Sequence, residues 1–95
     1  MILLVSYDLK KPGKDYSSLY NLLKSADNWW HFLESTWILY DASTNSSAAV
    51  NLWEDKIRAV TDSNDFFIVV DITKQARQGW LPKEAWEWLT SHENL

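Results

Sequence analysis

The feature that most constrains the fold is the first nine residues of the chain, Met1 to Leu9, in which an apolar run ends in a tyrosine and a carboxylate. An apolar run long enough for one strand is typical of the middle of a sheet, because both of its faces must be covered. The run closes on Tyr7 and Asp8. A carboxylate at the exit of a strand can hold a metal ion or a reacting group. An aspartate before a Lys-Pro-Gly turn is equally a common way to end a strand, so both interpretations stay open.

Length and composition indicate a small globular protein. The 95 residues suffice for one domain, and we predict a single domain over 1–95 with a core of about 1–72 and a C-terminal extension over 73–95. The absence of cysteine excludes disulfides, thiolate metal ligands and a cysteine nucleophile. The first strand is too short to span a bilayer and lacks the features of a signal peptide. We therefore expect a cytoplasmic, intracellular protein with no membrane partner.

The net charge of −4 argues against a wide electrostatic contact with a phosphate backbone. Lys10, Lys11 and Lys14 form the one local basic cluster in the sequence. If RNA or DNA is bound, we expect a small contact at these lysines, or a contact made by a dimer that doubles the cluster.

The first half of the chain predicts a helix followed by two strands. Asp15 is suited to cap a helix, and apolar side chains then recur at helical spacing at Tyr16, Leu19, Tyr20 and Leu23. Residues 29–40 are rich in aromatic and branched side chains, which favours strand. Because this segment is long for one strand, we expect a reversal near Glu34 and Ser35 into an antiparallel pair.

The second half predicts a helix, a strand and a final helix. The polar segment 43–47 offers several N-caps for a helix whose buried stripe is Val50, Trp53, Ile57 and Val60. Residues 62–65 are a predicted turn, and 66–72 are predicted to form a second strongly buried strand. Pro82 suits the first turn of a last helix, in which Ala85, Trp88 and Leu89 share a face.

This order of elements predicts an α+β fold, the ferredoxin-like split βαβ (βαββαβ) sandwich with an extra C-terminal helical segment. In that arrangement two helices cover one face of an antiparallel sheet, and the other face is open. The chain has seven tryptophans. They fit either a second copy stacked sheet to sheet, as a homodimer, or a tryptophan-rich contact with a protein partner.

Two short motifs resemble a known family. The apolar strand ending in Tyr7-Asp8, and the segment Ser35-Thr36-Trp37 in a later strand, resemble the second family of CRISPR-associated proteins. These are small ferredoxin-like homodimers related to VapD-type toxin ribonucleases. The likeness covers about residues 1–72. Stretches such as 12–16, 29–31 and 79–82 are similar to a divergent branch of small uncharacterised bacterial and phage proteins related to that group.

The resemblance implies a dimer and, in some members, an endonuclease that cleaves RNA or DNA with a metal ion. It implies that Asp8 of each subunit binds Mg²⁺ or Mn²⁺ across a two-fold axis, with Tyr7 and Ser35 as further catalytic residues. A hard cation takes oxygen ligands and stabilises charge that develops on a phosphate. Lys10, Lys11, Lys14 and His31 are the further candidate contacts to nucleic acid.

The chain also departs from the family pattern. Ser17, Ser18 and His31 stand where family members have arginines, and Leu33 stands where the motif has glutamine. These departures and the net acidity favour an alternative, a non-catalytic dimeric protein-binding module that acts as a subunit or inhibitor in a phage–host defence setting. A metal-dependent phosphodiester endonuclease and this binding module are the two hypotheses that the sequence supports, and whether the protein is an enzyme stays open.

Overall fold

The computed structural model describes residues 1–11, 13–93 and 95. In chain order its elements are β1 (Ile2–Asp8), α1 (Ser17–Leu23), β2 (Asn28–Leu33), β3 (Thr36–Tyr40), α2 (Ser46–Val60), β4 (Phe66–Asp71) and α3 (Lys83–Glu93). The reversal expected near Glu34 and Ser35 is confirmed, since those two residues separate β2 from β3. The structure is thus α+β.

The strands form one antiparallel sheet in the order β2-β3-β1-β4. β1 lies in the interior, between β3 and β4, as its apolar sequence predicts. Its register places Val5 opposite Trp37 of β3 on one side and opposite Val69 of β4 on the other. Because side chains alternate along a strand, the odd-numbered residues of β1 face one side of the sheet and the even-numbered residues face the other.

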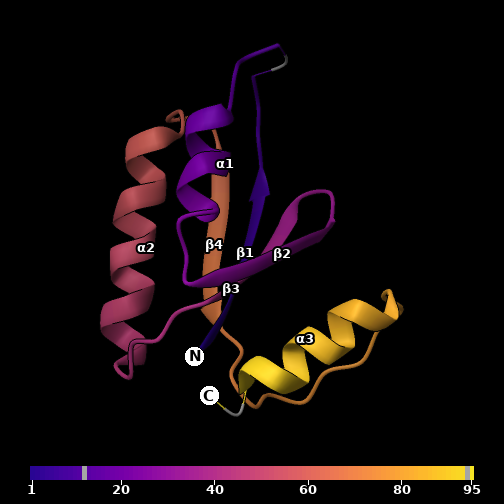
Figure 1. Ribbon diagram of the computed structural model, residues 1–95. Helices are drawn as coiled ribbons and strands as arrows, with labels where there is room; N and C mark the ends of the chain where they lie inside the picture. The colour runs from indigo at the N-terminus through magenta and orange to yellow at the C-terminus, as the bar shows by residue number, and fades with distance from the viewer. Residues whose placement is uncertain (12, 94) are drawn as a thin grey trace.

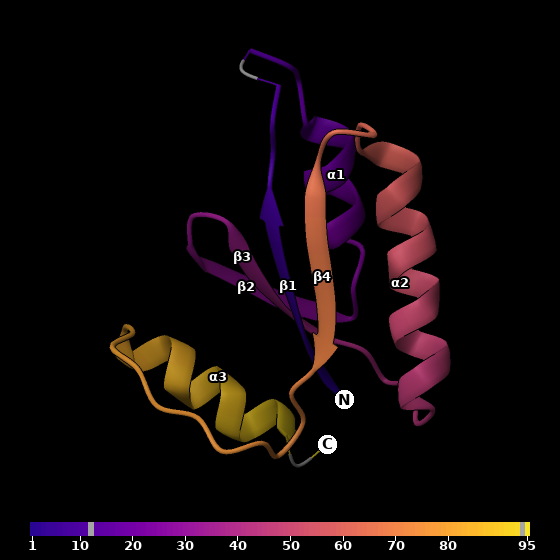
Figure 2. The same cartoon turned by 180° about the vertical axis from the view of Figure 1, so that it is seen from behind.

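α1 and α2 lie next to each other over one face of the sheet (Figures 1 and 2). The core beneath them joins odd-numbered residues of β1 to β3 and to the buried faces of both helices. Its buried members are Leu3, Val5, Tyr16, Leu19, Leu23, Trp37, Leu39, Trp53 and Ile57. Each fully buried aliphatic side chain contributes about 1.5–3 kcal/mol, so this layer holds the helices in place. The helical stripes predicted from the sequence are the stripes that pack here.

The caps of the two helices differ from each other. The Asn45 side chain accepts a hydrogen bond from the Ala48 N–H at 3.0 Å, which satisfies an end group of α2. Asp15 accepts from the Ser17 N–H at 2.9 Å, but the residue before α1 is Tyr16, which makes no side-chain cap. Asp15 therefore orders the backbone just before α1, and it lies one residue before the N-cap position.

α3 packs on the other face of the sheet, near the ends of the chain (Figures 1 and 2). The buried residues of this second core are Ile2, Trp30, Ile38, Ala85 and Leu89. The helix thus covers part of the face that was expected to be open. Of the predicted face of α3, Ala85 and Leu89 are buried and Trp88 is half-buried.

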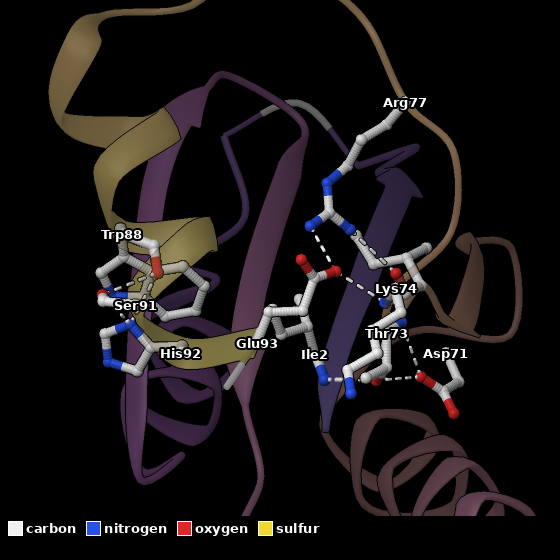
Figure 3. Close-up of polar contacts among 10 residues, drawn as sticks. Ile2, Asp71, Thr73, Lys74, Arg77, Trp88, Ser91, His92 and Glu93 are labelled. Carbon is white, nitrogen blue, oxygen red and sulfur yellow. Dashed lines mark hydrogen bonds and ion pairs between the residues drawn. The ribbon is translucent and has the colours of Figure 1, made fainter. Parts of the chain in front are cut away.

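A polar clasp holds α3 and the segment before it against β1 and β4 (Figure 3). The Glu93 carboxylate accepts from the Arg77 guanidinium at 2.5 Å and from the Lys74 N–H at 2.6 Å. Arg77 also donates to the Ile72 carbonyl at 3.0 Å. The Thr73 hydroxyl accepts from the Ile2 N–H at 2.8 Å. Residues 72–77 are therefore fixed to the sheet at one end and to α3 at the other.

The strand predicted over 66–72 is confirmed as β4, but the prediction that it is strongly buried is wrong. β4 is an edge strand, and burial alternates along it between half-buried and exposed positions. Phe66, Ile68 and Val70 are 67%, 58% and 38% exposed. They lie on the same face as α3, opposite Asp8, Ser6 and Leu4 of β1, but α3 does not reach them. We call these three residues the β4 strip.

Candidate functional site

Three residues predicted to act in a site meet where β1 ends beside the β2–β3 turn. The Tyr7 N–H donates to the Ser35 carbonyl at 3.0 Å, and the Tyr7 hydroxyl donates to the Glu34 carbonyl at 3.4 Å. His31 Nε2 lies 2.9 Å from that same carbonyl. A carbonyl only accepts, so His31 donates from Nε2 in this contact. These bonds fasten the turn to β1.

Trp37 joins these residues to a group of aromatic rings. Its indole N–H donates to the Tyr7 hydroxyl at 3.0 Å. The His31 ring stacks on the Trp37 ring at 4.0 Å and 15°, and the Tyr20 ring stacks on it at 6.2 Å and 16°. Burial raises the pKa of the Tyr7 hydroxyl, and the hydrogen bond from Trp37 only partly offsets the rise. Tyr7 is therefore neutral at physiological pH and is not poised to act as a base.

Asp8 lies apart from these groups. It follows Tyr7 in a strand, so the two side chains leave opposite faces of the sheet. Asp8 is exposed beside Phe66, its partner in β4, and its Oδ2 lies 2.5 Å from Lys10 Nζ. Within one chain the structure therefore brings Tyr7, Ser35 and His31 together, and it does not bring Asp8 to them.

Within the described residues, no three His, Asp or Glu side chains lie close enough together to hold a metal ion. Asp8 offers a single carboxylate and has an ammonium group as its neighbour. That donor set does not fit a divalent cation, which takes several oxygen ligands. A cation at Asp8 would therefore require a second subunit to supply further ligands.

The predicted basic cluster is paired with carboxylates. Lys11 and Lys14 each lie 3.2 Å from Asp62, and Lys10 pairs with Asp8. Hydrogen bonds from Lys14 and Lys11 lower the pKa of Asp62 and so favour its ionised form. The cluster therefore presents less free positive charge to a phosphate backbone than its sequence indicates.

Asp65 is a buried carboxylate that sequence reasoning placed in a turn and otherwise passed over. It is 1% exposed. It accepts from the Lys10 N–H at 2.8 Å, the Tyr16 hydroxyl at 2.9 Å and the Asp62 N–H at 2.8 Å. Burial alone would raise the pKa of Asp65, but these donors outweigh it and lower the pKa. Asp65 thus ties the loop after β1 to the start of β4, a structural role.

The α3 face also carries a groove, whose lining includes none of the three residues of the β4 strip. It has a volume of about 200 Å³ and lies between the sheet and α3. Its lining is mostly apolar and includes Leu4, Trp30, Ile38, Leu81 and Trp86. Phe32 and Leu33, at the end of β2, are also exposed. Apolar surface therefore remains free on this face although α3 is present.

Most of the tryptophans do not form the exposed surface that the sequence suggested. Trp30, Trp37 and Trp53 are buried, and Trp29, Trp86 and Trp88 are half-buried. Trp80 is 99% exposed. The indole rings therefore serve mainly as core, with Trp80 as the exception.

A second hollow lies on the opposite side of the sheet, beside α1. It has a volume of about 300 Å³, and we call it the aromatic cleft. Its lining residues are Tyr20, Lys24, Trp29, His31 and Trp37. Sequence reasoning singled out His31 alone among them as a ligand contact. The other residues could have been found from the sequence, because the aromatic-rich segment 29–31 and Trp37 lie on either side of a two-residue turn.

Comparison with models of protein families, with curated proteins and with solved structures finds no match to this chain. The resemblance seen in the sequence therefore stays a prediction. No helix in the described part of the chain is long and apolar enough to cross a membrane.

Proposed function

We propose that the protein is a small homodimeric, non-catalytic protein-binding module, and that its copies associate through the β4 strip. The observation that carries this proposal is the exposure of Phe66, Ile68 and Val70 in a row on one face of an edge strand. Exposed apolar patches of this kind mark interaction surfaces in soluble proteins. The proposed setting is a subunit or inhibitor in phage–host defence, as the family resemblance suggests.

A second copy of the chain suits this surface well. Under a two-fold axis each strip would face its own equivalent, so apolar groups would meet apolar groups. The free backbone groups of an edge strand add a tendency to associate. Nearby Leu4 is only half-buried and lies in the same face, opposite Val70. Association there would extend the second core instead of creating a separate one.

We further propose that the fold is ferredoxin-like. Support comes from the strand order β2-β3-β1-β4, with α1 following β1 and α2 following β3. In this arrangement each helix connects strands that have another strand between them. α3 is then an addition to that plan, and it leaves the β4 half of the open face free for a partner.

The oligomeric state in solution tests the dimer. Analytical ultracentrifugation of the wild-type protein over a range of concentrations should show a dimer, and Ile68→Lys should sediment as a monomer. Leu52→Lys is the matched control, because Leu52 is 51% exposed on α2, away from the strip. A wild-type protein that stays monomeric at its highest soluble concentration would refute the proposal.

A metal-dependent endonuclease is the second candidate, and one observation favours it. Asp8 lies on the same face as the β4 strip, opposite Phe66. A dimer formed through the strip would place Asp8 of both subunits near the interface, where the pair could supply the oxygen ligands that one chain lacks. Mg²⁺ or Mn²⁺ there would stabilise charge on a phosphodiester. Lys10 would have to release Asp8 first.

Cleavage of labelled RNA and DNA with Mg²⁺ or Mn²⁺ tests this candidate. The nuclease hypothesis predicts cleavage by the wild-type protein, loss of cleavage in Asp8→Ala and full cleavage by Asp55→Ala. Asp55 is the control because it is exposed on α2. Cleavage that persists in Asp8→Ala would exclude this site, and absence of any cleavage would leave the binding module.

A further inference from the structure

The aromatic cleft contains a ring stack that ends at the protein surface. Trp37 is its floor, since that side chain is 2% exposed. The His31 ring lies nearly parallel to the Trp37 ring at 4.0 Å, and the Trp29 ring lies 5.1 Å from it at 45°. His31 is exposed and Trp29 is half-buried. Since one face of His31 is covered by Trp37, its other face is open to a further planar ring.

The stack is held rigidly by hydrogen bonds. His31 donates to the Glu34 carbonyl at 2.9 Å, and the Trp37 indole donates to Tyr7 at 3.0 Å. A ring that is fixed in advance loses little conformational entropy when it binds a ligand. The open end of the stack is thus a preformed platform.

Lys24 gives the aromatic cleft its charge. Its Nζ lies 5.7 Å from the centre of the Trp29 ring, and among the residues that the structure describes no carboxylate forms an ion pair with it. The three lysines beside β1, in contrast, are all paired. An ammonium group already over an aromatic ring disfavours a cationic ligand and favours an anionic one.

We propose that the aromatic cleft binds a nucleotide, with its base stacked on His31 and Trp29 and its phosphate paired with Lys24. A planar ring joined to an anion matches the two chemical features of the cleft. Stacking of bases on aromatic side chains is tolerant of sequence, so no single base is favoured by the platform. The nucleotide can be free or can be a unit of a single strand, because both present the same groups.

This site is independent of the proposed dimer. The cleft belongs to the α1 side of the sheet, whereas the β4 strip lies on the α3 side. Substitutions in one do not touch the other. Loss of nucleotide binding with an intact dimer, or the reverse, would therefore separate the two proposals.

Tryptophan fluorescence tests the proposal with AMP, adenosine and oligo(dT) as probes. We expect the wild-type protein to be quenched in a saturable manner. His31→Ala should weaken binding of AMP by about tenfold or more, within the range known for base stacking. His31→Phe keeps a ring in the stack but loses the hydrogen bond to Glu34, and it should retain most of the binding. This pair distinguishes stacking from a general disturbance of the β2–β3 hairpin, and thermal unfolding of both variants checks the fold.

Two lysines offer a matched comparison for the phosphate. Lys24→Met should weaken AMP binding about tenfold and leave adenosine binding unchanged. Lys56→Met is the control, because Lys56 Nζ lies 5.5 Å from the Trp53 ring on α2, a similar pairing outside the cleft. Equal loss in the two variants would contradict the assignment of the phosphate to Lys24.

The probes also identify the source of the nucleotide. Binding of AMP as tightly as oligo(dT), per site, indicates a free nucleotide. Much tighter binding of oligo(dT) indicates single-stranded nucleic acid. If neither probe causes saturable quenching, or if His31→Ala binds both as the wild type does, the proposal is overturned.

Discussion

The Arg77 guanidinium and the Glu93 carboxylate lie 2.5 Å apart and join the segment before α3 to the last turn of that helix. Both side chains are partly buried, with 23% and 20% of their surface exposed. The same carboxylate accepts the Lys74 N–H, and Lys74 has a φ of +55°, in the left-handed region that non-glycine residues rarely adopt. The two hydrogen bonds to Glu93 therefore offset the conformational cost of the left-handed backbone at Lys74.

Removal of this pair should loosen α3. We expect Arg77→Met to lower the free energy of unfolding by about 2 kcal/mol, because a partly buried carboxylate would lose its charged donor. Urea unfolding measures the change. Arg58→Met is the control, since Arg58 and Glu54 form a more exposed pair at 3.9 Å on α2, and such pairs contribute about 0–1 kcal/mol. Equal effects in both variants would show that the Arg77–Glu93 pair stabilises the protein no more than an exposed surface pair does.

Asp65 should make the protein sensitive to acid. Its pKa is lower in the folded state than the ordinary value of about 3.9 in the unfolded chain. The stabilisation is then fully present above the unfolded pKa and is lost as the pH falls through the folded pKa. Asp65→Asn should destabilise the protein at pH 7 by about 2 kcal/mol, because one of the three donors at this buried site loses its acceptor.

The same substitution should also reduce the loss of stability between neutral and acidic pH. Chemical unfolding of wild type and Asp65→Asn from pH 7 downward measures both effects. Asp55→Asn, at an exposed position of α2, should leave the curve as it is in the wild type. If Asp65→Asn loses as much stability in acid as the wild type does, carboxylates other than Asp65 cause the acid sensitivity.

The proposed dimer makes thermal stability depend on concentration. A ligand that binds only the folded state stabilises it by mass action, and a second subunit acts in the same way. The unfolding midpoint of the wild type should therefore rise with protein concentration, whereas that of Ile68→Lys should stay constant. Differential scanning fluorimetry over a concentration series measures both. A constant midpoint for the wild type would argue against self-association.

Local patterns predicted the helices, the hairpin turn and the interior position of β1. Each of these follows from the hydrophobic pattern or the turn within a short segment of the chain. The burial of β4 was predicted wrongly. Residues 66–70 are all apolar, so no alternation marks the exposed face. An edge position depends on which strands pair, and that is decided by residues far away in the chain.

The candidate site divides in a similar way. That Tyr7 and Asp8 leave opposite faces follows from the period of a strand alone. The approach of His31 and Trp37 follows from the position of the turn. The pairing of Lys14 with Asp62, in contrast, joins residues 48 positions apart. This pairing neutralises positive charge that a local count of lysines indicates as free. No local sequence pattern predicts the pairing.

The two glycines should respond to alanine with opposite signs. An added Cβ would meet no atom within 4 Å at either position, so only the backbone differs. Gly13 has a φ of +77°, where a side chain is strained. Gly79 has no such φ. We expect Gly13→Ala to destabilise the protein by about 1 kcal/mol. Gly79→Ala should be neutral or should stabilise it by about 0.5 kcal/mol, because the unfolded chain loses freedom.

Urea unfolding of the two variants beside the wild type measures this difference. The expected order of stability is Gly79→Ala, wild type, Gly13→Ala. Because Gly13 lies in the loop that Asp65 ties to β4 through the Lys10 N–H, strain at Gly13 would also be expected to weaken that attachment. Asp65→Asn should therefore cost less in the Gly13→Ala background than in the wild type. Strictly additive effects of the two substitutions would show that the turn and the buried carboxylate act independently.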